Sequence, residues 1–216
     1  MVQYNAKTWM NRNRVLHPTR GWQYINVPVR KSPHGTPIHD ISVVDPAVAR
    51  TRILGQLKHY EKHAPYYSRV TELITRSFNL TSTDRLVDLN LSALIVICDY
   101  LGIRLNWALC SEMELDLSAV NDAGQWALCI SRQLGATDYI NPSGGENLFN
   151  PDDWSESGIK LHIYEAPDWE YTCEPYQHEK NLSILDVLMW NDPGTVRDIL
   201  ARSRAKRIYE PVDTKG

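Results

Sequence analysis

Several features that would place the chain in a special class of protein are absent. No apolar run approaches the roughly 20 residues that a helix needs to cross a bilayer, and no basic and then apolar stretch opens the chain as in a signal peptide. Lysine and arginine number 23 against 26 acidic residues, a net charge of −3, whereas general nucleic-acid binders are usually basic. We therefore predict a cytoplasmic protein without a membrane span and without general nucleic-acid binding.

Cysteine and phenylalanine are both scarce. The four cysteines form no Cys-x-x-Cys pair, so we predict reduced thiols, no disulfide framework and no metal site. Only 2 residues are phenylalanine, whereas 7 are tryptophan and 11 are tyrosine. These two residue types join an apolar ring to a polar group. Their excess suits stacking on a sugar or a base, or an ordinary core whose aromatic residues are amphipathic.

The N-terminal third is predicted to form β structure. Residues 22–29 alternate, with Ile and Val on one face and Trp, Tyr and Asn on the other. A Ser-Pro-His-Gly turn follows at residues 32–35, and residues 38–44 return as a second strand. Pro28 cannot donate a ladder hydrogen bond, so we expect this hairpin at the edge of a sheet.

The rest of the chain alternates between helical and extended patterns. Helices are predicted over residues 46–60, 68–78, 85–101, 118–134, 182–190 and 196–204, and strands over 103–109, 137–141 and 159–163. This order predicts an α/β fold, with a mixed, partly parallel sheet flanked by helices and an N-terminal β-hairpin. We assign residues 1–206 to one domain and residues 207–216 to a frayed C-terminal tail.

Two strand ends are candidate parts of a ligand site, because α/β sheets bind ligands beyond the carboxyl ends of their strands. One end is at Ser111, and the other runs from Asn141 into Ser143-Gly144-Gly145. The glycines would let an anion or a sugar approach the backbone, although a plain turn has the same composition. Neither the P-loop lysine nor the dinucleotide-binding glycine spacing is present.

Polar residues at two further places suggest binding. Asn90 interrupts the apolar stripe of the predicted 85–101 helix, and burying an unpaired amide costs on the order of 1–3 kcal/mol. Its side chain therefore needs a partner, either backbone or ligand. Asn11-Arg12-Asn13 is dense in donors that suit phosphates and sugar hydroxyls, with a solvated loop as the alternative.

Two residues are candidate bases. His39 lies beside Asp40, and a histidine side chain can act as a base, although a histidine with a structural partner is the plain alternative. Asp186 follows Ser183 in a Ser-x-x-Asp pattern, which is also the signature of a helix cap. No Gly-x-Ser-x-Gly elbow is present.

Segments spread over nearly the whole chain match one family in order. They are Val2-Gln3-Tyr4, residues 9–14, 22–31 and 60–67, Leu89-Asn90, Ser111, residues 135–145 and residues 182–186. In these segments the chain resembles the WbqC-like proteins, which are associated with bacterial O-antigen and other surface-polysaccharide gene clusters. The family's usual opening, a strand and a Gln-Pro-x-Tyr-Phe-Pro-like loop before a helix and a second strand, does not precede Val2. We expect part of a nucleotide site to be missing with it, and a homo-oligomer to cover an otherwise exposed apolar face.

The resemblance implies a transferase that attaches an aminoacyl group, glycyl, to the amine of a nucleotide-linked amino-dideoxyhexose. Its partners would be that amino sugar and an amino-acid donor. A non-catalytic nucleotide-sugar or carbohydrate binding protein of a polysaccharide assembly pathway is one alternative. Another is an amino-acid ligase, which would use ATP with Mg²⁺.

The positions in the matching segments suggest roles in such a reaction. Arg12 and Lys31 would bind phosphate or carboxylate, and Asn11, Asn13 and Asn90 would bind sugar hydroxyls or the oxyanion. His39 or Asp186 would be the base. We expect the polar N-terminal residues, Lys31, Asn90 and the 143–145 loop to converge on one cleft, and we include Ser111 and Asn141 among the substrate-binding residues.

Overall fold

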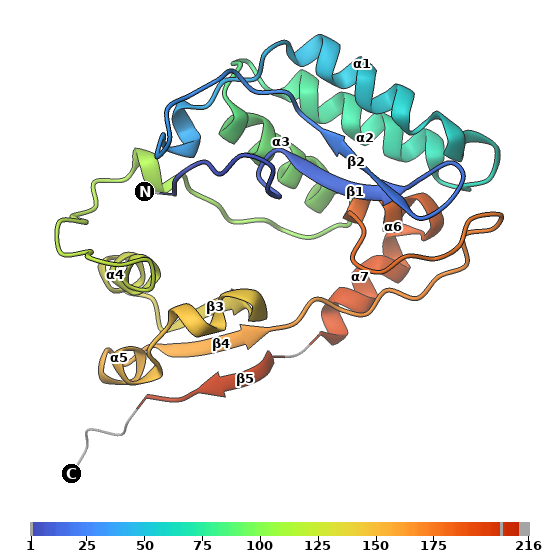
Figure 1. Ribbon diagram of the computed structural model, residues 1–216. Coiled ribbons are helices and arrows are strands. Elements are labelled where there is room, and N and C mark those ends of the chain that lie inside the picture. Colours follow the sequence, from blue (N-terminus) through green and yellow to red (C-terminus); the bar gives the residue numbers. More distant parts are fainter. Residues whose placement is uncertain (1, 204, 212–216) are drawn as a thin grey trace. The chain divides into compact units, whose positions relative to one another are not determined.

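The computed structural model describes residues 2–203 and 205–211 (Figure 1). The chain divides into two compact units, each described here by itself. The first consists of the residues up to Trp107 together with Asp168–Ile199, and the second of Ala108–Pro167 together with the residues from Leu200 onward. The expectation of one domain over residues 1–206 stays a prediction.

A two-stranded antiparallel hairpin opens the first unit. It pairs β1 (Arg12–Leu16) with β2 (Trp22–Asn26). Gly21 has φ +69°, a conformation that favours glycine, and its carbonyl accepts the N–H of His17 at 2.8 Å to close the turn. The expected α/β fold with an N-terminal hairpin is therefore confirmed.

The partner strand is not the one predicted. Residues 38–44 form no strand: Ile38–Asp40 is a 3-10 helix (η1), and a single antiparallel bridge joins Val29 to Val43. Proline explains the difference, because Pro37 sets the extended backbone that begins η1 and Pro28 lacks the N–H that a longer ladder would need. The strand β1 pairs with β2 instead.

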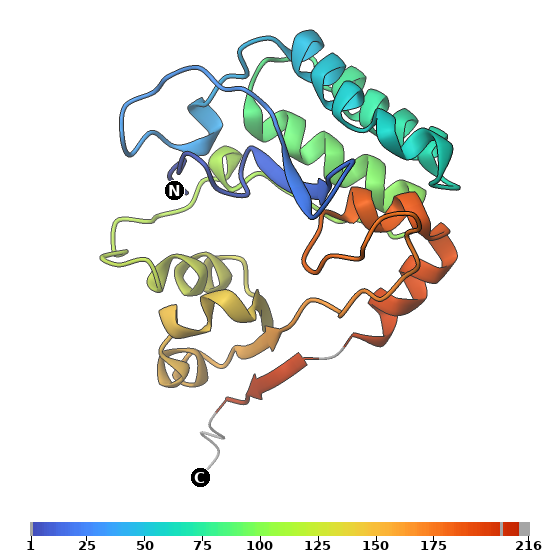
Figure 2. The same ribbon diagram turned by 45° about the vertical axis from the view of Figure 1, so that its right-hand side comes forward.

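Helices pack on this hairpin in the first unit. Strand β2 contacts α1, and strand β1 contacts α6. Figure 2 shows the blue hairpin lying across the green helices, with the orange-red α6 beside it. The helical elements are α1 (Pro46–Gln56), η2 (Lys58–Lys62), α2 (Tyr67–Leu80), α3 (Leu86–Tyr100), α6 (Ile184–Trp190) and α7 (Pro193–Arg202), the last of which runs on into the second unit.

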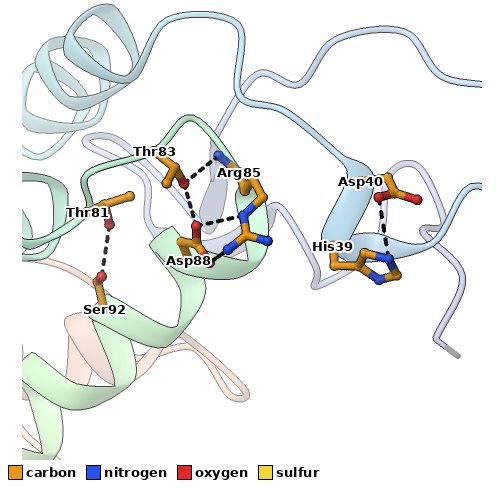
Figure 3. A network of polar contacts seen from close by, with 7 residues as sticks. All are labelled: His39, Asp40, Thr81, Thr83, Arg85, Asp88 and Ser92. Atoms are coloured by element: carbon orange, nitrogen blue, oxygen red, sulfur yellow. Dashed lines mark hydrogen bonds and ion pairs between the residues drawn. The ribbon is translucent and has the colours of Figure 1, made fainter. Parts of the chain in front are cut away.

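Local side-chain contacts lie at the start of two of these helices. Asp45 caps α1, because its Oδ1 accepts the N–H of Val48 at 3.0 Å while Pro46 occupies the first turn. At the start of α3, Asp88 accepts two hydrogen bonds from the guanidinium of Arg85, at 2.9 and 3.0 Å, and one from the hydroxyl of Thr83 (Figure 3). Buried residues of both helices join one core cluster, which consists of Ile41, Val43, Ala49, Leu86 and Leu89.

The second unit is built on a three-stranded sheet. Strand β4 (Lys160–Tyr164) pairs in parallel with β3 (Asp138–Pro142) and antiparallel with β5 (Ala205–Tyr209). Trp154 is 1% exposed and stacks on Tyr139 at a centroid distance of 4.7 Å. The other elements of this unit are η3 (Cys110–Glu112), α4 (Gln125–Gln133), η4 (Ser143–Leu148) and α5 (Pro151–Glu156).

Three sequence predictions in or near this unit differ from the structure. Residues 103–109 form no strand, and Leu105 and Trp107 are 37% and 52% exposed, so this apolar run lacks both a pairing partner and a core. The predicted 118–134 helix begins only at α4, because Asp122 accepts the N–H groups of Gly124 and Gln125 in a turn before it. Residues 207–209 of the expected tail belong to β5, while residues 212–216 lie outside the described residues.

Within the described part of the chain, no helix combines the length and the apolar character needed to cross a membrane.

The cap of α1 generates a stability prediction. Replacing Asp45→Ala removes the acceptor for the Val48 N–H and should lower the free energy of unfolding by about 1 kcal/mol. The Asp45→Asn variant keeps a side-chain acceptor and should stay close to the wild type. Urea denaturation of the three proteins measures this, and equal stability of the alanine variant and the wild type would contradict the assignment.

Candidate functional site

The first unit encloses a cavity of about 240 Å³ between the hairpin and the helices. Its walls come from the segment before β1, from both strands and from α1, α2, α3 and α6. The lining residues are Trp9, Met10, Asn11, Arg12, Asn13, Ile25, Asn26, Val27, Ile53, Leu73, Ile74, Ser77, Phe78, Leu89, Asn90, Ala93, Ile97, Ser183, Ile184 and Leu185.

One part of the cavity wall is apolar. Helix α2 contributes Leu73 and Phe78, and helix α3 contributes Ala93 and Ile97. Ala93 and Ile97 are four residues apart and so lie on the same face of α3. Such a wall favours the C–H groups of a ligand through the hydrophobic effect.

Another part of the wall carries side-chain amides, among them those of Asn11, Asn13 and Asn90, whose predicted binding roles stay a prediction. The amide of Asn90 donates to the carbonyl of Met10 at 3.0 Å, and that of Asn11 donates to Val27 at 2.9 Å. Asn90 therefore takes a backbone partner 80 residues earlier in the chain. Each amide nitrogen carries two hydrogens, and the Oδ1 of Asn11 is buried without a partner.

Arg12 brings the positive charge of the cavity lining. Its guanidinium lies 4.0 Å from the centroid of the Tyr24 ring, a cation–π contact across the hairpin. Among the described residues no carboxylate forms an ion pair with it. Arg12 can therefore offer its N–H groups to an anion at the cavity.

No described lining residue is an acid, a histidine, a cysteine, a tyrosine or a lysine. The lining supplies apolar contact, amide donors and acceptors, hydroxyl groups and one guanidinium. What these groups do chemically is bind and orient a ligand.

Asp186 lies outside the lining and is fully buried on α6, with 0% exposure. Its Oδ2 accepts the N–H of Leu16 at 2.9 Å and the hydroxyl of Tyr60, and its Oδ1 accepts the hydroxyl of Tyr171 at 2.9 Å. Burial raises the pKa of Asp186, although these donors oppose the shift. Ser183, three residues before Asp186, caps α6 by accepting the N–H of Leu185, as the Ser-x-x-Asp capping pattern predicts.

His39 and Lys31 also lie outside the cavity lining. His39 is on η1, with its Nε2 3.4 Å from Oδ1 of Asp40 and its side chain 22% exposed (Figure 3). Lys31 is exposed in the segment after β2.

The remaining predicted residues belong to the second unit. Ser111 is in η3, Asn141 is in β3, and Ser143-Gly144-Gly145 begins η4. A Cβ on Gly145 would lie 2.6 Å from Nδ2 of Asn141, so close packing explains this glycine. The expected convergence of these residues with Asn11, Arg12 and Asn90 stays a prediction.

Several lining residues were not among the predicted site residues, including Trp9, Asn26 and Ser77. Asn26 had a readable signal, because it lies on the polar face of the alternating 22–29 segment. Ser77 had none, since a serine within a helix is compatible with either burial or exposure.

The fold and the cavity define an α/β protein with a ligand-sized cavity beneath an N-terminal hairpin. The model of the WbqC-like protein family matches residues 1–198, and the chain belongs to this family. Comparisons with curated proteins and with solved structures gave no significant match.

The buried carboxylate generates a stability prediction. The Asp186→Ala variant leaves the Leu16 N–H and the hydroxyls of Tyr60 and Tyr171 without their acceptor. Because a buried unsatisfied donor costs about 1–3 kcal/mol, the free energy of unfolding should fall by about 2–4 kcal/mol. Thermal and urea unfolding measure this loss, and a variant as stable as the wild type would show that the carboxylate does not organise this region.

The pH dependence of stability follows from the same group. The folded protein holds a proton on Asp186 over a pH range in which the unfolded chain has released it, because burial raises the pKa of the folded state. This contribution to stability is full below about pH 4 and is lost as the pH rises through the raised pKa. The wild type should therefore lose stability relative to Asp186→Asn as the pH rises from about 4 to 7. A wild type that instead gains stability relative to Asp186→Asn over this range would mean that the pKa is lowered.

Proposed function

We propose that the cavity of the first unit binds the sugar of a nucleotide-linked amino-dideoxyhexose, and that the protein attaches an aminoacyl group, glycyl, to the amine of that sugar. The observation that carries the proposal is a single cavity whose lining combines an apolar wall, side-chain amides and one guanidinium that has no ion pair within the described part of the chain. The family resemblance supplies the substrate class.

A dideoxyhexose suits this lining better than a fully hydroxylated sugar does. Its missing hydroxyl groups expose C–H surface, for which Phe78 and Ile97 provide an apolar partner. Its remaining hydroxyls both donate and accept, as do the amides of Asn11 and Asn90. Arg12 would bind the phosphate next to the sugar through charge-assisted hydrogen bonds.

The proposed transfer needs a neutral amine. The amine nitrogen forms a bond to the acyl carbon, the bond from that carbon to the donor's leaving group breaks, and the amine proton passes to a base. The second hydrogen of the Asn11 or Asn90 amide would bind the developing oxyanion. Both base candidates lie outside the cavity lining. His39 is partly exposed to solvent and keeps the proposed role of base, whereas we propose a structural role for Asp186 because three donors enclose its carboxylate.

One observation favours a second candidate function, the binding of a nucleotide sugar without conversion. The described cavity lining contains no acid or base that could move a proton. A binding protein of a polysaccharide assembly pathway needs none.

Incubation with candidate nucleotide-linked amino sugars and glycine donors separates these functions. A transferase should give a product heavier by one glycyl residue from an activated donor, without ATP cleavage. A ligase should give that product from free glycine with ATP and Mg²⁺, and should release AMP or ADP. Binding measured by calorimetry without any product would support the binding protein, and absence of both binding and product would overturn the proposal.

Arg12 provides the test at the residue level. The Arg12→Ala variant should weaken nucleotide-sugar binding by roughly tenfold to a hundredfold, because one charge-assisted hydrogen bond is lost. Its stability should change little, since the stacking on Tyr24 is an exposed contact. Arg52→Ala is the matched control, because Arg52 is exposed on α1 and does not line the cavity. Equal loss of affinity in both variants would point to overall charge and against a site at Arg12.

A further inference from the structure

The outer face of the hairpin carries two arginines stacked on two aromatic rings. Arg12 lies over Tyr24 at 4.0 Å, and Arg14 lies over Trp22 at 5.1 Å from the ring centroid. Trp22 and Tyr24 meet edge to face, with their centroids 5.0 Å apart. The alternation of both strands places all four residues on one face, opposite the buried side chain of Ile25. We call these four residues the arginine–aromatic ladder.

The ladder is accessible. Trp22 and Tyr24 are each 40% exposed, which is high for aromatic residues within a strand pair. An exposed aromatic face beside a guanidinium provides a stacking surface for a planar ring.

The two guanidinium groups have no carboxylate partner among the described residues. Arg14 is held in place by its ring contact and by one hydrogen bond from Nη2 to the carbonyl of Asn181 at 2.9 Å. Its other N–H groups remain available. A guanidinium fixed in this way loses little freedom when it binds a phosphate.

The ladder continues directly from the cavity, because Arg12 belongs to both. Trp22 pairs with Leu16, which is four residues along β1 from Arg12. At 3.4 Å per residue, the ladder is therefore about 14 Å long. This length suits a diphosphate followed by a nucleoside. The far end lies near Glu179, since a Cβ on Gly21 would be 3.8 Å from its Oε1. A neutral base fits that end better than a phosphate does.

We propose that the arginine–aromatic ladder binds the nucleoside diphosphate part of the nucleotide sugar. Arg12 and Arg14 hold the diphosphate, and the base stacks on the exposed ring of Trp22. This inference rests on the proposed function, because it places the nucleotide of the substrate whose sugar occupies the cavity. It adds Arg14, Trp22 and Tyr24 to the site.

Single-stranded nucleic acid is the competing ligand for an arginine and aromatic surface. Trp22 and Tyr24 meet edge to face and so present no row of parallel rings for successive bases, and the chain carries a net charge of −3. Both features favour a single nucleotide over a polymer.

The test compares free UDP, free dTDP, inorganic pyrophosphate and the intact nucleotide sugar by calorimetry. Arg14→Ala should lower the affinity for both nucleoside diphosphates and for pyrophosphate by about tenfold to a hundredfold. Trp22→Leu should lower the affinity for the nucleoside diphosphates by roughly fivefold to a hundredfold. The affinity for pyrophosphate should not change, because only stacking on the ring is lost. Arg14→Lys should restore part of the pyrophosphate affinity, since it keeps the charge without the planar fork.

Two variants control for loss of charge and of an exposed ring. Arg52→Ala and Trp107→Leu change exposed residues that lie outside the ladder and should bind every probe as the wild type does. Thermal unfolding of each variant identifies any that fails to fold. If Arg14→Ala does so, Trp22→Leu with UDP and pyrophosphate decides the question alone.

The outcomes separate this inference from the proposed function. If the wild type binds the nucleotide sugar and the Arg14 and Trp22 variants bind it equally well, the ladder is not the nucleotide site, while the cavity proposal stands. If UDP or dTDP binds in an Arg14-dependent way but the sugar adds no affinity, the ladder stands and the cavity proposal fails. Tighter binding of an oligonucleotide than of either nucleoside diphosphate would overturn the inference, as would absence of all binding.

Discussion

The arrangement of the first unit depends on one buried carboxylate. Asp186, on α6, accepts hydrogen bonds from the end of β1, from η2 and from the segment before α6, through Leu16, Tyr60 and Tyr171. A carboxylate removed from water is tolerated only when donors surround it, so these four segments are fixed together. The hydrogen bond from the Leu16 N–H to Asp186 holds the end of β1 in place. The hairpin that starts with Arg12 forms one wall of the cavity.

The same constraint connects the fold with ligand binding. Beyond Asp186, the N–H of Ser183 donates to the carbonyl of Arg14 at 2.8 Å, and Arg14 donates to Asn181. The chain entering α6 therefore runs beside β1 and helps to orient the outer face of the hairpin. At the other end of β1, Asn90 and Asn11 secure the segment that carries the polar lining. Asn11, Asn90 and Arg14 therefore help to fix the hairpin and are also residues that would touch the ligand, whereas Asp186 only fixes it.

Local patterns in the sequence predicted local structure well, because their physical causes are local. The helical pattern of residues 46–60 and the alternation of residues 22–29 identified α1 and the two faces of β2. Alternation does not specify a partner strand. The sequence therefore predicted residues 38–44 as the partner of β2, whereas the partner is β1, residues 12–16. The interrupted stripe showed that Asn90 needs a partner, but not that the partner is Met10, and the capping pattern around Asp186 concealed its long-range donors. These failures concern contacts between segments distant in sequence, which periodicity does not encode.

The central claim is that the cavity beneath the hairpin holds the sugar of the substrate. Ala93 is half-buried on α3 and lines that cavity, so Ala93→Phe would reduce the cavity volume and leave Arg12 and Arg14 unsubstituted. The most direct test is calorimetric titration of Ala93→Phe and the wild type with the intact nucleotide-linked amino sugar and with the free nucleoside diphosphate. The account predicts that the variant folds, binds the nucleoside diphosphate as the wild type does and loses the additional affinity contributed by the sugar. A folded variant that binds the intact nucleotide sugar with wild-type affinity would contradict it.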